Sequence, residues 1–126
     1  MSTTQVDVGT PTDLTVFTNT ALGNTAVGVK SSSAAVWSVT IDNSANGAAT
    51  YVKLYNVASG SVVVGTTVPD EVIYVPASQI VTVMYFTSAS GAKVFGTALT
   101  AAALTAGGTA GTTSPSSSVI VSIRYV

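Results

Sequence analysis

The 126-residue chain contains no cysteine and no histidine. Without cysteine it has no disulfide, no thiolate nucleophile and no zinc or iron–sulfur site of the usual kind. Without histidine it lacks the commonest general base and the commonest transition-metal ligand. Acid–base catalysis would have to rely on carboxylates, tyrosine and lysine alone, so we expect a protein that is not an enzyme and that holds no cofactor.

Charge is also scarce in this chain. Charged residues make up 7% of it, against about 25% in an ordinary soluble domain, and the formal net charge is -1. Nucleic-acid binding needs a basic surface that neutralises phosphates, so no nucleic-acid partner is expected. A monomer with so few charges tends to self-associate, whereas a subunit that buries its surface in an assembly needs fewer of them. The composition therefore predicts a permanent assembly, with a homo-oligomer as its simplest form.

Long apolar runs are missing too. No segment approaches the roughly twenty apolar residues that cross a membrane. The first residues, MSTTQVDVGTPTD, lack the basic start and the apolar stretch of a signal peptide. We therefore expect no membrane contact and a protein made in the cytoplasm. Residues 1–13 are polar and contain glycine and proline, which predicts an extended N-terminal arm ahead of one domain at residues 14–126.

Short runs of alternating apolar and polar residues are what the chain does contain. Residues 36–57 show this pattern most clearly, because two such runs flank a polar break that contains Asn46-Gly47. Side chains of a strand switch faces at every residue, and Asn-Gly readily adopts the positive φ angles of a tight reversal. The pattern predicts two strands joined in an antiparallel hairpin. Residues 14–18 and 26–30 predict a second hairpin at the edge of a sheet.

Glycine and proline divide the rest of the chain into further runs of strand length. Residues 79–86 (QIVTVMYF) are apolar on both faces and predict a central strand, with one face against a second sheet and the other against a loop or another subunit. Residues 100–118 are small and predict a strand end followed by a long loop. Further strands are expected at residues 71–75, 92–99 and 119–126. Seven or eight short strands predict an all-β fold, a single antiparallel β-sandwich of jelly-roll or immunoglobulin-like topology.

Two groups of polar residues share features with catalytic or metal sites. Asp70 and Glu71 provide the two carboxylates that glycoside hydrolysis requires, but adjacent residues of an extended strand point apart, which favours a structural role. Residues 42–47 (DNSANG) place oxygen-bearing side chains like the first half of a calcium-binding EF-hand loop. Lys53 stands where the bidentate glutamate should be, so we expect a turn held by Asp and Asn hydrogen bonds and no bound metal.

Tyr51, Lys53 and Tyr55 alternate along the second run of residues 36–57 and are expected to share one face of a strand. Tyrosine offers rigid contact area at a low entropic cost, so these three residues form the candidate partner surface. A protein partner is favoured over a sugar, and an ordinary sheet surface is favoured over both.

Residues 36–126 resemble small β-sandwich proteins encoded among the structural genes of tailed bacteriophages. The similar segments are VTIDN (39–43), YVKLYN (51–56), VGTTVPD (64–70), AGTTSPSS (110–117) and the final SVIVSIRYV. The resemblance implies a non-enzymatic virion structural protein, most like a capsid decoration or cement protein that binds the major capsid protein or another virion protein. A phage tail, baseplate or fibre subunit is the first alternative, and a carbohydrate- or surface-binding module is the second. In such a protein, residues 1–13 are expected to add a strand to a neighbour's sheet edge.

Overall fold

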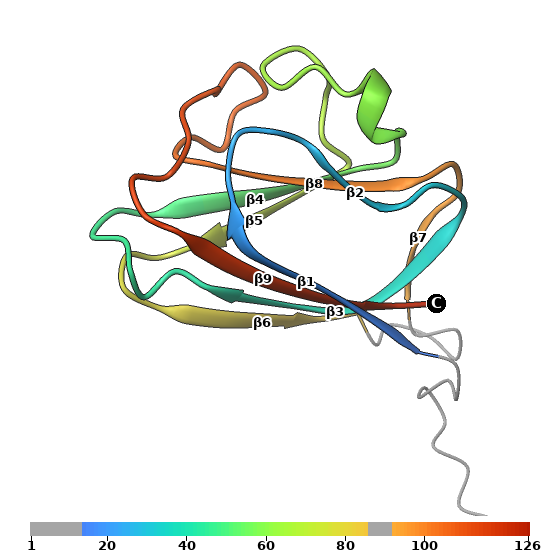
Figure 1. Ribbon diagram of the computed structural model, residues 1–126, viewed down its shortest axis with the longest axis horizontal. Coiled ribbons are helices and arrows are strands. Elements are labelled where there is room, and N and C mark those ends of the chain that lie inside the picture. The colour runs from blue at the N-terminus through green and yellow to red at the C-terminus, as the bar shows by residue number, and fades with distance from the viewer. Residues whose placement is uncertain (1–13, 86–91) are drawn as a thin grey trace, which may run out of the picture.

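A computed structural model describes residues 14–85 and 92–126, which form two antiparallel sheets packed as a sandwich (Figure 1). The predicted arm at residues 1–13 and the end of the run at residues 79–86 lie outside the described residues. The all-β prediction is confirmed, with nine strands in the described part of the chain in place of seven or eight. The elements are β1 (Thr15–Leu22), β2 (Val27–Lys30), β3 (Ala34–Asp42), β4 (Thr50–Tyr55), a 3-10 helix η1 (Ser59–Ser61), β5 (Glu71–Val75), β6 (Ile80–Met84), β7 (Lys93–Phe95), β8 (Leu99–Leu104) and β9 (Val119–Tyr125).

Sheet A contains β1, β9, β3 and β6 in that order, and β7 pairs with β3 next to β6. Sheet B contains β2, β8, β4 and β5. β1 and β3 lie in sheet A and β2 and β4 in sheet B, so the chain crosses from one sheet to the other after each of the first three strands. This order is that of a jelly roll built from two Greek keys, which selects between the two predicted topologies.

The hydrophobic core lies between the inward faces of the two sheets. Along β9, Val119, Val121 and Ile123 are buried while Ile120 and Arg124 are exposed, as the alternation predicts. Removing apolar surface from water stabilises by about 25 cal/mol per Å², so this shared core is the main force that holds the sheets together. Other buried members are Leu22, Ala34, Val36, Val39, Ile41, Val52, Leu54, Ile73, Val75, Phe95, Leu99, Ala101 and Ala103.

Two predicted hairpins are wrong. β3 lies in sheet A and β4 in sheet B, so residues 36–57 form an arch between the sheets, and β1 and β2 are divided in the same way. Among the described residues, positive φ angles occur at Ser78 and Gly65 alone. Asn46-Gly47 therefore does not make the tight reversal of a hairpin. Alternation does not separate the two cases, because a half-buried strand shows the same pattern in an arch and in a hairpin.

The buried side chain of Asn43 holds the arch between β3 and β4. Its Nδ2 donates to the carbonyl oxygens of Ala48, at 3.1 Å, and Pro76, at 3.0 Å. Its Oδ1 accepts hydrogen bonds from Thr50 Oγ1, at 2.8 Å, and Asn46 Nδ2, at 2.9 Å. One side chain therefore ties the turn to the first residue of β4 and to the residue that follows β5.

The strand predicted to be central, β6, is an edge strand. It pairs with β3 on one side, and no described strand pairs with its other side. Val81 and Val83 pack against the core, which confirms that one face of this strand meets the second sheet. The opposite face carries Ile80 and Met84, which stay exposed on the single subunit. Contact of that face with another subunit stays a prediction.

Residues 100–118 are the end of a strand followed by a long loop, as predicted. The alanine-rich segment at their start is β8, an internal strand of sheet B in which every residue is buried, and residues 105–118 form the expected loop. Ala101 and Ala103 belong to the core, whereas Ala102 and Leu104 lie on the opposite face of the strand. Small side chains suit this strand because it is covered on both faces.

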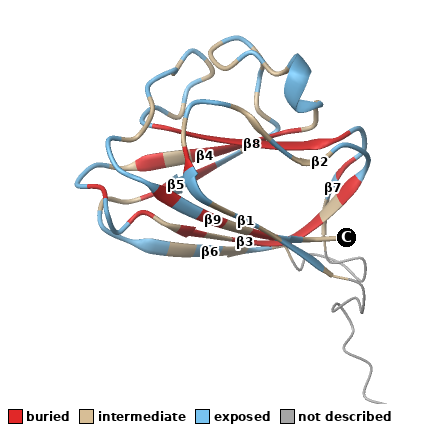
Figure 2. Cartoon of the chain, viewed as in Figure 1, coloured by how far each residue is buried: buried red, intermediate tan, exposed pale blue. Residues whose placement is uncertain are grey.

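Residues 56–70 and 105–118 form a loop layer over the outer face of sheet B, away from sheet A (Figure 1). The two loops meet at Gly65, whose φ is +96° and where an added Cβ would lie 2.5 Å from the side chain of Thr112, so only glycine fits. The layer accounts for the burial of β8 along its whole length (Figure 2). No described loop covers the outer face of sheet A, where exposed residues alternate along β6 and β9.

The role of Asn43 predicts a large loss of stability for Asn43→Asp. The carboxylate would place an oxygen against the carbonyls of Ala48 and Pro76, so the buried charge is unpaired, and we expect a cost of about 3 kcal/mol in the free energy of unfolding by urea. Asn19→Asp is the matched control, because Asn19 only accepts a bond from the Ala21 N–H at 2.9 Å. Equal losses for the two variants would contradict this role of Asn43.

Candidate functional site

The predicted partner surface lies on β4 and points toward the loop layer. Tyr51, Lys53 and Tyr55 do share one face, but the exposed fraction is 0% for Lys53 and 1% for Tyr55, and Tyr51 is half-buried. These side chains are buried because the loop layer covers them, and the position of that layer depends on residues far along the chain. Two of the three side chains are thus absent from the surface of the single subunit, and binding of a partner here stays a prediction.

Close contacts join these side chains to the loops. Lys53 Nζ donates a hydrogen bond to the carbonyl oxygen of Gly108 at 2.6 Å. The ring of Tyr51 lies against Gly107, where an added Cβ would approach it to 2.9 Å. On the other side Tyr51 meets Tyr74 of β5, with ring centroids 5.4 Å apart and the planes tilted by 50°. The face expected to hold a partner therefore holds part of the chain itself.

Burial changes the ionisation of two of these groups. Desolvation lowers the pKa of Lys53 below its usual value and raises the pKa of Tyr55 above its usual value, because burial disfavours the charged form of each. A neighbouring carbonyl offsets only part of the cost of a buried ammonium group. Lys53 is thus a positive charge held under a loop, where it fastens the loop at some cost in stability.

The sequence 42–47 makes a hydrogen-bonded turn, as predicted. Asp42 Oδ1 accepts from the backbone N–H of Ser44 at 2.9 Å and from its hydroxyl at 2.5 Å, and these bonds lower the pKa of Asp42. Asn46 Oδ1 accepts from the N–H of Ser117 at 2.8 Å. These side-chain oxygens already serve the fold. No group of three or more acidic, histidine or cysteine residues that could hold a metal occurs within residues 14–85 and 92–126.

Asp70 and Glu71 have separate structural partners. Asp70 Oδ2 accepts from the backbone N–H of Asn56 at 2.6 Å, and Glu71 Oε2 accepts from Tyr85 Oη at 3.1 Å. The pKa of Tyr85 is raised by burial and by the adjacent Glu71 charge. Asp70 therefore joins the two ends of the loop at residues 56–70, and Glu71 joins β5 to the residue after β6. Both contacts fit the structural role that the sequence favours for Asp70 and Glu71.

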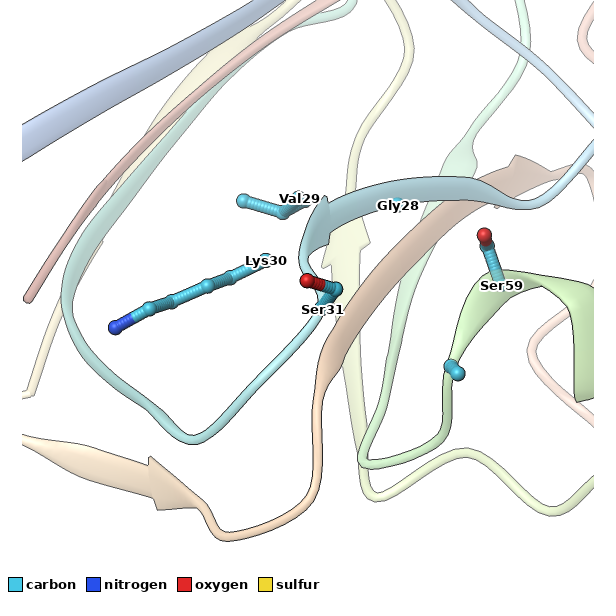
Figure 3. Close-up of a pocket in the computed structure, with 6 residues that line it drawn as sticks. Gly28, Val29, Lys30, Ser31 and Ser59 are labelled. Atoms are coloured by element: carbon cyan, nitrogen blue, oxygen red, sulfur yellow. The ribbon is translucent and has the colours of Figure 1, made fainter.

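Two small cavities lie beside the loops. One of about 160 Å³ is lined by β2 and η1, and the Lys30 side chain beside it extends away from Ser59 (Figure 3). A second, of about 270 Å³, is lined by uncharged residues of the turn before β4 and of the loop at residues 105–118. Both are smaller than the roughly 300–1,000 Å³ of ordinary ligand pockets. Neither gathers the titratable groups that catalysis needs.

Most of the exposed large apolar side chains gather elsewhere, on the side of sheet A that faces away from the core. Among the described residues, five of the nine such side chains lie there, on four of its five strands. We call this surface the outer face of sheet A. It consists of Val16, Ile80, Met84, Val94 and Ile120 with the polar residues between them, Thr18, Ser38, Thr40, Asp42, Thr82, Ser122 and Arg124.

Strand pairing arranges hydroxyl groups in a row across the outer face of sheet A. Thr18 pairs with Ser122, Ser122 with Thr40, and Thr40 with Thr82. The hydroxyl oxygens are 3.4 Å apart in the first pair and 3.1 Å apart in the last. Apolar side chains flank the row, and Asp42 and Arg124 are the two charged residues of the face. Such a surface loses little free energy of hydration when another protein covers it.

The chain matches no protein-family model, no curated protein and no solved structure. No helix in the described part of the chain is long and apolar enough to cross a membrane. What the structure establishes is the small two-sheet, all-β sandwich. The likeness to phage structural proteins stays a prediction.

The burial of Lys53 predicts a pH-dependent difference between the wild type and Lys53→Met. The pKa of Lys53 in the folded chain lies below its usual 10.5, so the unfolded chain binds that proton more tightly. Wild-type stability therefore gains a contribution as pH rises toward 10.5. Methionine fills similar space without charge. We expect Lys53→Met to have the higher free energy of unfolding by urea at pH 7, and this difference from the wild type should shrink between pH 7 and pH 10. A difference that stays constant with pH would contradict the buried charge. Tyrosines shared by both proteins cancel in the comparison.

Proposed function

We propose that this protein is a non-enzymatic virion structural protein, a capsid decoration or cement protein that binds across capsomers and stabilises the shell. The observation that carries the proposal is the outer face of sheet A, which combines exposed apolar residues with hydroxyl groups and only two charges. The resemblance of residues 36–126 to phage structural proteins supports the same role.

The chain treats its two outer faces differently. Residues 56–70 and 105–118 cover sheet B, while Ile80, Met84 and Val94 on sheet A are 61%, 53% and 64% exposed. An apolar surface left open beside polar residues is typical of an interaction site. A flat sheet face suits contact with another protein, since small molecules bind in concave pockets. These features favour a large protein surface as the partner.

On a shell of repeated subunits, a weak contact at each site is sufficient for stable binding. A protein that binds the assembled shell and not its dispersed subunits stabilises the shell by mass action. Linked contacts on one particle strengthen each other without any new interaction. Because Asp42 and Arg124 are the only charges among the described residues of the face, its binding should depend little on salt.

The carbohydrate-binding alternative requires an exposed aromatic platform. Among the described residues, Tyr74 is the aromatic side chain classed as exposed, and its neighbour Tyr51 is half-buried and tilted against it. Two tilted rings give no flat stacking surface. The geometry of the described tyrosines therefore favours the virion role over the sugar-binding one.

The test is binding to capsid shells assembled from the major capsid protein of the same phage, with dispersed capsid protein for comparison. We expect the wild type to sediment with the shells in a fixed ratio and to raise their melting temperature. Val16→Lys places a charge on the outer face of sheet A and should weaken binding at least about tenfold, because a buried unpaired ammonium is costly. Val68→Lys changes a still more exposed valine in the loop layer and should bind normally.

The outcomes separate the alternatives. Absence of the protein from shells and its presence in purified tails would favour the tail, baseplate or fibre role. Glycan binding that is lost in Tyr74→Ala would favour a carbohydrate module. Equal binding by Val16→Lys and Val68→Lys would show that the outer face of sheet A is not the contact surface.

A further inference from the structure

The outward edge of β6, with which no described strand pairs, carries a further inference. The carbonyl of Gln79 accepts from the Asn43 N–H at 2.9 Å, and the N–H of Tyr85 donates to the Trp37 carbonyl at 3.0 Å. The peptide groups of these two odd-numbered positions therefore point toward β3. Because peptide groups alternate in direction along an antiparallel strand, those of the even-numbered residues between them point away from β3. Three N–H and three C=O groups, those of Ile80, Thr82 and Met84, thus face outward.

The other sheet edges are protected against pairing, and β6 is not. β1 and β2 shift register along their pairings, and β2 ends in Lys30. β5 starts at Glu71 and is followed by Pro76, and β7 has three residues. Charges, proline, irregular pairing and shortness are the usual means of blocking edge-to-edge association. β6, with the sequence IVTVM, pairs with β3 without a register shift and contains no charge, glycine or proline.

We propose that β6 pairs antiparallel with β6 of a second copy, around a twofold axis at Thr82. This register places Thr82 opposite Thr82 of the second copy, and Ile80 opposite Met84 of the second copy. The outward N–H groups of each copy then face the outward C=O groups of the other, so every free peptide group of the edge finds a partner. A slip by one residue would put outward groups opposite inward ones. A slip by two would leave outward groups at one end of each strand without a partner in β6 of the other copy, so this register makes the most hydrogen bonds.

Side-chain packing favours the same register. Ile80 and Met84 are exposed on the single subunit, and directly opposite side chains on paired strands lie about 5 Å apart. Pairing would bring these two apolar side chains into contact twice, once on each side of the axis. On the inner face, Val81 would lie opposite Val83 of the second copy, which extends the core side of sheet A across the junction.

The axis is perpendicular to the sheet, so both outer faces point in the same direction. Sheet A would continue into sheet A of the second copy, and the hydroxyl row that ends at Thr82 would run on across the axis. The pair would present the outer face of sheet A twice on one continuous surface. This inference concerns the isolated protein and does not rest on the proposed virion function.

A charge-swap experiment at Thr82 tests both the edge and the register. The full-length wild type, Thr82→Lys and Thr82→Glu are measured by light scattering behind a sizing column at several concentrations. We expect the wild type at twice the monomer mass of 12.5 kDa. Each variant alone should dimerise at least about tenfold more weakly, because two like charges meet at the axis. An equimolar mixture of the two variants should restore the dimer, since opposite charges then meet.

Thr18→Lys is the matched control. Thr18 belongs to the same hydroxyl row and also bonds a neighbouring hydroxyl, but it lies on β1 at the opposite edge of sheet A. This variant should dimerise like the wild type. A monomeric wild type would overturn the proposal, as would a mixture of Thr82 variants that fails to dimerise. Equal weakening by Thr18→Lys would indicate contact through the sheet face and would also overturn it. Circular dichroism checks that each variant is folded.

Discussion

Burial of strands on both faces, in a chain with very few charges, is the constraint on which the rest of this structure depends. A sandwich buries one face of each sheet automatically. β4 and β8 are largely buried on their second face as well, and that face needs its own cover. The loop layer provides it. The loops consist largely of small residues, and their close approach at Gly65 and Gly107 keeps water from sheet B.

Lys53 illustrates how this cover works. A long side chain with an apolar stem fills space beneath the loops, and its amine reaches the Gly108 carbonyl. The charge is expensive there, as its lowered pKa indicates. The same bond fixes residues 105–118 over β4, so the cost is tied to the position of the loop. On the single subunit, Lys53 therefore forms an internal contact between β4 and the loop that covers it.

Alternation along single strands was sufficient to predict the all-β sandwich and the orientation of β9. Alternation did not predict the connections between strands or the exposure of a strand face where these depend on residues distant in the chain. Asn46-Gly47 looks like a hairpin turn, but the buried amide of Asn43 bonds Pro76 beyond β5 and holds an arch instead. The partner surface at Tyr51, Lys53 and Tyr55 failed as an exposed patch because its cover lies some fifty residues away in the chain. The outer face of sheet A was missed because five separate strands build it.

The edge of β6 and the outer face of sheet A use different groups of the same residues. The proposed pairing at the edge would use the peptide groups of Ile80, Thr82 and Met84, whereas docking on the face would use side chains across all of sheet A. One contact therefore does not block the other. Edge pairing would double the face that meets a larger surface, and doubling the number of linked contacts strengthens binding far more than improving one contact. An apolar, nearly uncharged face and an unprotected edge are hazards in a free monomer, and both become useful when the chain works as a repeated subunit.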